Sequence, residues 1–216
     1  MSDRSTAERY GAITLALIAW FGVLLQLLLS IRLAQANGKS VVEGLVVYFG
    51  YFTVLSNIFV ALVASARVLP TQSRTARWLA SESTLGCATT AIILVGLAYH
   101  LLLRKIWDPQ GWQWVADVVL HYIVPALTLF YWLLSRHPQR LPAWLPLAWC
   151  AYPVAYLVYA LIRGVWLNNY PYPFIDVSVL GYPRMLLNGI GLLGAFIVVG
   201  YLVRAGALLR RRADHS

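Results

Sequence analysis

The chain has 216 residues, of which 60% are hydrophobic and only 12% are charged, and its formal net charge is +9. An ordinary soluble domain carries about 25% charged residues, so this composition excludes a soluble globular protein and indicates an integral membrane protein. Cys87 and Cys150 lie inside apolar segments and show no CxxC spacing, so neither a disulfide framework nor a thiol redox site is indicated.

Six apolar stretches are each long enough to cross a bilayer as a helix of about 20 residues. They are expected near residues 10–34, 45–67, 82–103, 115–135, 144–163 and 183–204. We therefore expect an all-α fold, a single domain over residues 1–216. It would be a polytopic membrane helix bundle with six transmembrane helices.

The basic residues show which way this bundle should face. With six spans both termini lie on one side, and eleven of the 17 Lys and Arg residues fall on that side, against six on the other. The positive-inside rule then places both termini in the cytoplasm. This topology, together with attraction to anionic lipid, also explains the cluster Arg210-Arg211-Arg212, so no nucleic-acid partner is expected.

Within the second segment, the stretch 48–60 carries three polar side chains inside an apolar run: Thr53, Ser56 and Asn57. On a continuous helix Gly50, Thr53 and Asn57 share one face, with Ser56 beside them. Thr53 would lie about 12 Å below the external start of this helix, at 1.5 Å per residue. The alternative is that Thr53 only bonds the carbonyl four residues before it, as threonines in membrane helices commonly do.

The third and fourth segments contribute the titratable groups. His100 ends the third segment near the external face, where it could be a simple interface residue. Asp117, His121 and Pro125 follow at four-residue steps, which places them on one face of the fourth helix. Pro125 cannot donate to the carbonyl of His121. His121 would lie about 9 Å below its helix start, near the depth of Thr53, although it could also be satisfied by Asp117 alone.

The external stretch 168–176 is rich in aromatic residues and proline, which favours a stiff cap over the helix ends. Asn188 follows in the outer half of the sixth segment, where it, like Asn57, could also be interhelical glue. The polar and titratable groups of the bundle therefore gather in its outer half. Burying such groups unpaired in a membrane is costly, so they indicate a functional chamber open toward the external leaflet.

Three short motifs resemble the androgen-induced membrane hydrolase family, in particular its small bacterial six-span branch. They are Phe52-Thr53 with Ser56-Asn57, His121 with Pro125, and the block Tyr170-Pro171-Tyr172-Pro173-Phe174. Animal members use a membrane threonine as nucleophile and a membrane histidine as its partner to cleave fatty acid esters of hydroxy fatty acids. The resemblance implies these roles for Thr53 and His121, and a place in the bacterial inner membrane.

Elementary chemistry agrees with this hypothesis, because a threonine hydroxyl needs a base within hydrogen-bond reach and a neutral imidazole suits that role. Asp117 could orient His121, and Asn57 or Asn188 could donate to the developing oxyanion. The substrate would be a lipid that enters from the bilayer. No cofactor or metal is expected, and the oligomeric state is left open.

Three alternatives remain at this point. His100 and His121 could ligate a haem axially in an electron-transfer protein. Asp117, His100 and His121 could together hold a catalytic zinc ion. A non-enzymatic lipid-binding or transport protein would use the same apolar bundle without any chemistry.

Overall fold

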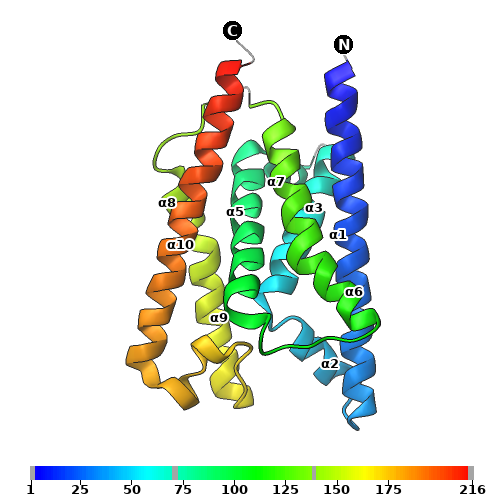
Figure 1. Cartoon of the computed structure of the whole chain (residues 1–216), viewed down its shortest axis with the longest axis vertical. Helices are drawn as coiled ribbons and strands as arrows, with labels where there is room; N and C mark the ends of the chain where they lie inside the picture. Colours follow the sequence, from blue (N-terminus) through cyan, green and yellow to red (C-terminus); the bar gives the residue numbers. More distant parts are fainter. Residues whose placement is uncertain (1–2, 70–72, 138–139, 214–216) are drawn as a thin grey trace.

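The computed structural model describes residues 3–69, 73–137 and 140–213, which form an all-helical bundle without a strand among them (Figure 1). The bundle opens with α1 (Asp3–Ala36) and closes with α10 (Val177–Ala213). Between them lie α2 (Val41–Tyr48), α3 (Phe52–Val68), α4 (Arg74–Leu79), α5 (Glu82–Ala98), α6 (Trp112–Val118), α7 (Val124–Leu134), α8 (Leu145–Trp149) and α9 (Ala151–Leu167).

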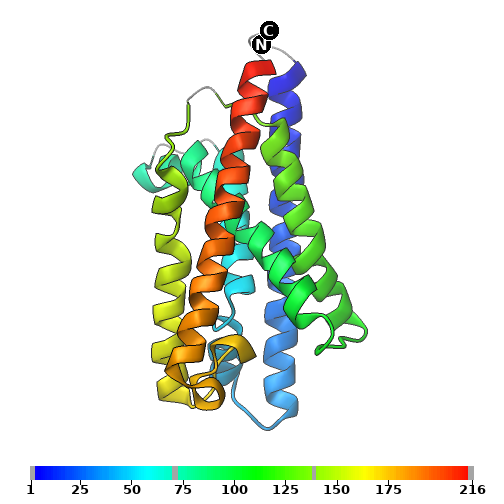
Figure 2. The ribbon, with the colours of Figure 1, turned by 60° about the vertical axis from the view of Figure 1, so that its left-hand side comes forward.

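The described residues contain five helices long and apolar enough to cross a membrane, or six if the bent pair α2 and α3 counts as one span. The first turn of α1 and the last turn of α10 lie at the same end of the bundle in both views (Figures 1 and 2). A multi-span membrane helix bundle is thereby confirmed, whereas the number six depends on how the bent pair is counted.

Helix α5 occupies the centre of the bundle, between α3, α7, α9 and α10 (Figure 1). Its residues Leu85, Ala88, Ala91 and Ile92 are almost fully buried. They pack in one continuous core with residues of α1, α3, α7 and α10. Small side chains let the neighbouring helices approach this central helix closely, as is usual where lipid supplies no hydrophobic driving force between helices.

The predicted continuous helix over 45–67 is wrong. The chain bends by 80° between α2 and α3, and residues 49–51 are not helical. Gly50 therefore lies in the break and shares no helix face with Thr53 and Asn57. The depth of 12 Å expected for Thr53 also fails, because it assumed one straight helix. Thr53 is instead the second residue of α3.

Side chains of α9 stabilise this break by binding the backbone carbonyls that it leaves without helical partners. The hydroxyl of Tyr156 donates to the carbonyl of Gly50 at 3.0 Å, and that of Tyr159 donates to the carbonyl of Phe49 at 3.2 Å. The guanidinium of Arg163 donates to the carbonyl of Val46 at 3.3 Å. A Cβ on Gly50 would meet this guanidinium at 2.9 Å and would displace it from its place at the break.

The other predicted spans agree with the structure apart from their ends and two local features. The predicted spans 82–103 and 115–135 each contain a wider π-helical turn: η1 (Tyr99–Leu103) continues α5, and η2 (Val119–Ile123) joins α6 to α7. Helix α10 is interrupted at Gly181, whose φ is 70°, just before the expected start of the sixth span at residue 183. A final short element, η3 (Pro173–Ile175), lies in the predicted external cap.

Candidate active site

Thr53 and His121 meet between α3 and the π-helical turn η2. The hydroxyl oxygen Oγ1 of Thr53 lies 3.4 Å from Nε2 of His121. Thr53 is 9% exposed, and the side chain of His121 is 13% exposed. Thr53 does not use its hydroxyl on the carbonyl four residues earlier, because that residue, Phe49, lies outside the helix. Its hydroxyl is therefore available to the imidazole.

Asp117 fixes the orientation of the His121 ring from one helical turn away. Nδ1 of His121 lies 3.0 Å from the carbonyl oxygen of Asp117 and 3.2 Å from its carboxylate oxygen Oδ1. Both neighbours are acceptors, so Nδ1 carries the proton and Nε2 presents its lone pair to Thr53. Hydrogen bonds thus connect Thr53 to His121 and His121 to Asp117, which is the order of a nucleophile, its base and the acid that orients the base.

The π-helical turn determines which backbone carbonyl Pro125 leaves without a partner. The N–H of Val124 donates to the carbonyl of Val119, five residues back. In the same register the N–H of residue 125 would donate to the carbonyl of Leu120. Proline has no N–H, so the Leu120 carbonyl is the one left without a backbone partner, and not the His121 carbonyl that an α-helical register predicts. The side-chain amide of Asn57 donates to this Leu120 carbonyl at 3.3 Å.

Asn57 therefore joins the two elements that carry the nucleophile and the base. Its amide nitrogen also donates to the carbonyl of Thr53 at 2.8 Å, and the side chain is fully buried. Both N–H groups are thereby directed at carbonyls, so Asn57 acts as a positioning residue rather than as the oxyanion donor considered from the sequence. Its Oδ1 atom has no hydrogen-bond partner among the described residues.

Tyr172, from the external cap, contacts the nucleophile directly. Its hydroxyl lies 3.3 Å from Oγ1 of Thr53 and accepts a hydrogen bond from the backbone N–H of Thr53 at 3.2 Å. Burial raises the pKa of Tyr172 to about 12, so the phenol keeps its proton at neutral pH. The hydroxyl of Tyr172 is thus a hydrogen-bond donor beside Oγ1 of Thr53, close to where the carbonyl oxygen of an ester attacked by Thr53 would become negative.

The cap holds Tyr172 in place through contacts with α9 and α10 and through ring packing within the cap itself. The ring of Tyr170 lies against Gly164 of α9, where a Cβ would come within 2.1 Å of it. Asn188 of α10 donates from its side-chain amide to the carbonyl of Phe174 at 2.9 Å. The rings of Tyr172 and Phe174 stack at 5.0 Å. The stiff cap expected from the sequence therefore serves to position a side chain of the site.

Tyr99 covers the other face of the imidazole. Its ring stacks on that of His121 with centroids 3.9 Å apart and planes at 17°, and its hydroxyl interacts with the Asp117 carboxylate. Tyr99 begins η1, so both π-helical turns lie at the site. Such turns are often found at functional sites because they redirect side chains within a helix.

Three of the proposed supporting residues lie away from the Thr53 hydroxyl. Ser56 bonds Tyr152 of α9 at 3.2 Å. Asn188 donates from its side-chain amide to the carbonyl of Phe174 in the cap. His100 is exposed and lies 3.3 Å from the hydroxyl of Tyr122, through Nδ1. The structure therefore brings together Thr53, Asn57, Asp117 and His121.

The two metal alternatives fit this geometry poorly. Both ring nitrogens of His121 face protein atoms, namely Thr53 and Asp117, whereas a haem ligand needs one nitrogen directed at the iron. Within residues 3–69, 73–137 and 140–213, no group of three His, Cys, Asp or Glu side chains could hold a metal ion. A zinc site of Asp117, His100 and His121 is therefore not formed.

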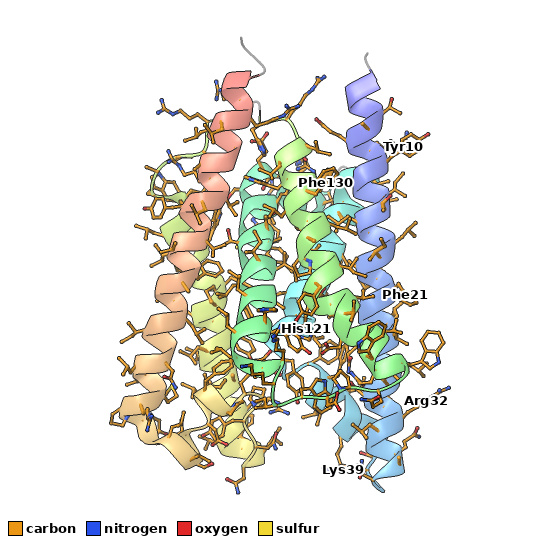
Figure 3. All side chains as sticks on the ribbon, in the orientation of Figure 1. Tyr10, Phe21, Arg32, Lys39, His121 and Phe130 are labelled. Carbon is orange, nitrogen blue, oxygen red and sulfur yellow. The ribbon has the colours of Figure 1, made fainter. Side chains whose placement is uncertain are left out.

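Tyr99 and Tyr172 are site residues that the sequence reasoning missed as such. Tyr172 belongs to the aromatic block that carries the family resemblance, but the composition of that block by itself indicates only a cap. Tyr99 directly precedes His100, and nothing in the sequence distinguishes it from other interfacial tyrosines. Figure 3 shows His121 among the helices in the half of the bundle that ends at Arg32 and Lys39, opposite the termini.

No protein-family model, no curated protein and no solved structure matches the chain.

Proposed function

We propose that the protein is an intramembrane ester hydrolase that acts on lipids, with Thr53 as nucleophile and His121 as general base. The observation that carries this proposal is the hydrogen-bonded series from the Thr53 hydroxyl through His121 to Asp117. The distance of 3.4 Å is long for a hydrogen bond, and such bonds commonly tighten only when substrate is bound.

The proposed reaction has two halves. In the first, Oγ1 of Thr53 attacks the ester carbonyl while Nε2 of His121 takes the hydroxyl proton, and Asp117 stabilises the imidazolium. The hydroxyl of Tyr172 donates to the carbonyl oxygen as it becomes negative. His121 then returns the proton to the departing alcohol, which leaves an acyl ester on Thr53.

In the second half, water attacks the acyl ester. His121 takes a proton from this water and returns it to Oγ1 of Thr53, so that a fatty acid leaves and the hydroxyl is restored. Every proton removed by His121 is returned within the same half, so no cofactor is required.

The substrate class and location follow from the sequence. Fatty acid esters of hydroxy fatty acids are proposed through the resemblance of the Thr53 and His121 motifs. The excess of Lys and Arg on the side of the termini favours cytoplasmic termini, with the site in the outer half of the membrane. A bacterial inner membrane is proposed through the resemblance alone.

Hydrolysis by the purified protein in nanodiscs tests the proposal. A fatty acid ester of a hydroxy fatty acid should be cleaved by the wild type and by Ser56→Ala, but not by Thr53→Ala or His121→Ala. Ser56 is the matched control, since it is a buried hydroxyl one turn away that bonds Tyr152 instead. A fluorophosphonate probe should label Thr53, and labelling of a different residue would overturn the assignment.

The lipid-binding alternative places a lipid in the same bundle without turnover. It predicts that Thr53→Ala and wild type bind a labelled lipid equally and that neither releases fatty acid. Turnover by the wild type alone separates the two functions.

A further inference from the structure

Thr53 lies at the boundary between two cavities of different character. The larger has a volume of about 700 Å³, and its polar lining includes Gln26, Gln113 and Lys39. The smaller has a volume of about 110 Å³ and lies between α5, α9 and α10, where its walls include Val95, Leu157 and Leu192. Thr53, Tyr99, Leu103 and Tyr172 line both cavities.

His121 and Asp117 line only the larger cavity. This asymmetry bears on how an ester can bind, because the base that activates the nucleophile must later protonate the departing alcohol oxygen. The alcohol side of the ester therefore has to lie on the side of His121. The acyl side has to extend the other way from Thr53.

We infer that the acyl chain binds in the small apolar pocket between α5, α9 and α10, and that the departing alcohol occupies the larger polar cavity. This inference rests on the proposed function and adds to it the direction in which the ester lies. It assigns acyl-chain selection to the smaller pocket and alcohol selection to the larger cavity.

The chemistry of the walls fits this assignment. The small pocket is lined by aliphatic and aromatic side chains, and each methylene of an acyl chain buried there contributes about 0.8 kcal/mol. Val154, which lines this pocket, is 44% exposed on the outer surface of the bundle, so the pocket lies close to the bilayer. In the larger cavity, Gln113 donates to the side-chain oxygen of Gln26 at 2.8 Å, and Lys39 adds a positive charge. An alcohol that carries further polar groups suits these walls.

Two glycines of α10 provide a matched pair for the test. Gly189 lines the small pocket, and a Cβ there would meet Leu157 at 3.4 Å, an ordinary contact. Gly191, two residues on, has nothing within 4 Å of its Cβ position and lines neither cavity. Gly189→Leu therefore shortens the proposed acyl pocket, whereas Gly191→Leu adds the same side chain to the same helix outside it.

The experiment measures kcat/KM for p-nitrophenyl acetate, butyrate, octanoate and palmitate. Gly189→Leu should lower the value for palmitate at least about tenfold, equivalent to losing the burial of roughly two methylene groups. The ratio of the palmitate value to the acetate value should therefore fall in Gly189→Leu, and Gly191→Leu should leave this ratio unchanged. Equal effects of Gly189→Leu on acetate and palmitate would contradict the inference.

A second series keeps an acetyl group and lengthens the alcohol from methyl to dodecyl. Ser30→Phe, which narrows the larger cavity, should disfavour the long alcohols, and Gly189→Leu should not. The opposite pattern, with Gly189→Leu selective for alcohol length, would reverse the orientation and overturn the inference.

A readout without turnover keeps this inference separate from the proposed hydrolase. If the wild type cleaves no ester, the hydrolase proposal fails, and a photoreactive diazirine palmitate then tests the pocket alone. Crosslinks to α9 and α10 near Leu157 and Leu192, weakened by Gly189→Leu, support a fatty-acyl site. Crosslinks to α1 and α6 near Gln26 and Gln113 overturn it.

Discussion

Oγ1 of Thr53 lies 3.4 Å from Nε2 of His121, although the two residues are 68 positions apart in the chain. Neither helix alone determines this contact. It depends on the break before α3 and on the π-helical turn in the fourth span. It also depends on Asn57, whose side-chain amide donates to the carbonyls of Thr53 and Leu120.

Asp117→Asn tests whether the carboxylate next to His121 contributes to catalysis. The carboxylate stabilises the imidazolium that forms when His121 takes the proton of Thr53, and a neutral amide in its place does not. We expect kcat to fall roughly 100- to 10,000-fold with KM little changed, which steady-state hydrolysis measures. Glu82→Gln is the matched control, because Glu82 faces another buried histidine, His137, at 3.8 Å. Equal losses in both variants would contradict the assignment.

Asn57→Ala tests the link between the two elements. The carbonyls of Thr53 and Leu120 both lose a donor. The Thr53 carbonyl keeps the backbone N–H of residue 57 as its helical partner, whereas the Leu120 carbonyl is left unpaired. The free energy of unfolding should therefore fall by about 1–3 kcal/mol, the cost of one unpaired buried group. SDS titration in mixed micelles measures it. Asn188→Ala, which removes one bond to the cap, should cost less, and a larger loss there would contradict the linking role of Asn57.

Pro125→Ala tests the π-helical turn. The restored N–H can bond the carbonyl of His121 in an α-helical register, which rotates the imidazole away from Thr53. We expect kcat to fall about 100-fold without loss of stability, because a displacement of roughly 1 Å can have that effect. Pro146→Ala, in α8, is the control and should change neither quantity. Wild-type kcat in Pro125→Ala would show that the turn is not needed.

Tyr172→Phe tests the proposed oxyanion donor. The variant keeps the ring packed on Phe174 but loses the hydroxyl beside Thr53. Loss of one such donor should lower kcat about 100- to 1,000-fold, measured at neutral pH. Tyr152→Phe is the control, since its hydroxyl bonds Ser56, away from the hydroxyl of Thr53. A kcat within twofold of wild type for Tyr172→Phe would assign the donor elsewhere, twofold being about 0.4 kcal/mol.

The raised pKa of Tyr172 also predicts a pH dependence of stability. The neutral phenol is the form favoured in the folded protein, so the contribution to stability is present below pH 10 and is lost as pH rises toward 12. Between these values the wild type should lose more unfolding free energy than Tyr172→Phe. SDS titrations at several pH values measure this difference, and identical losses would contradict it.

The sequence by itself determined the class of the protein and part of its site. In a membrane, the backbone N–H and C=O groups of a long apolar segment find their hydrogen-bond partners within the segment when it forms a helix. Composition was therefore enough to predict the fold class. The spacing of Asp117 and His121 sufficed for their contact, because residues four apart on a helix are neighbours whatever surrounds them.

The tertiary structure alone decided the break before Thr53 and the place of Tyr172. Hydropathy cannot locate such a break, because its free carbonyls are bound by Tyr156, Tyr159 and Arg163, more than 100 residues further along the chain. The π-helical register around His121 likewise depends on an amide from another helix. Contacts between residues so distant in the chain arise from the packing of the helices, and local sequence patterns do not predict them.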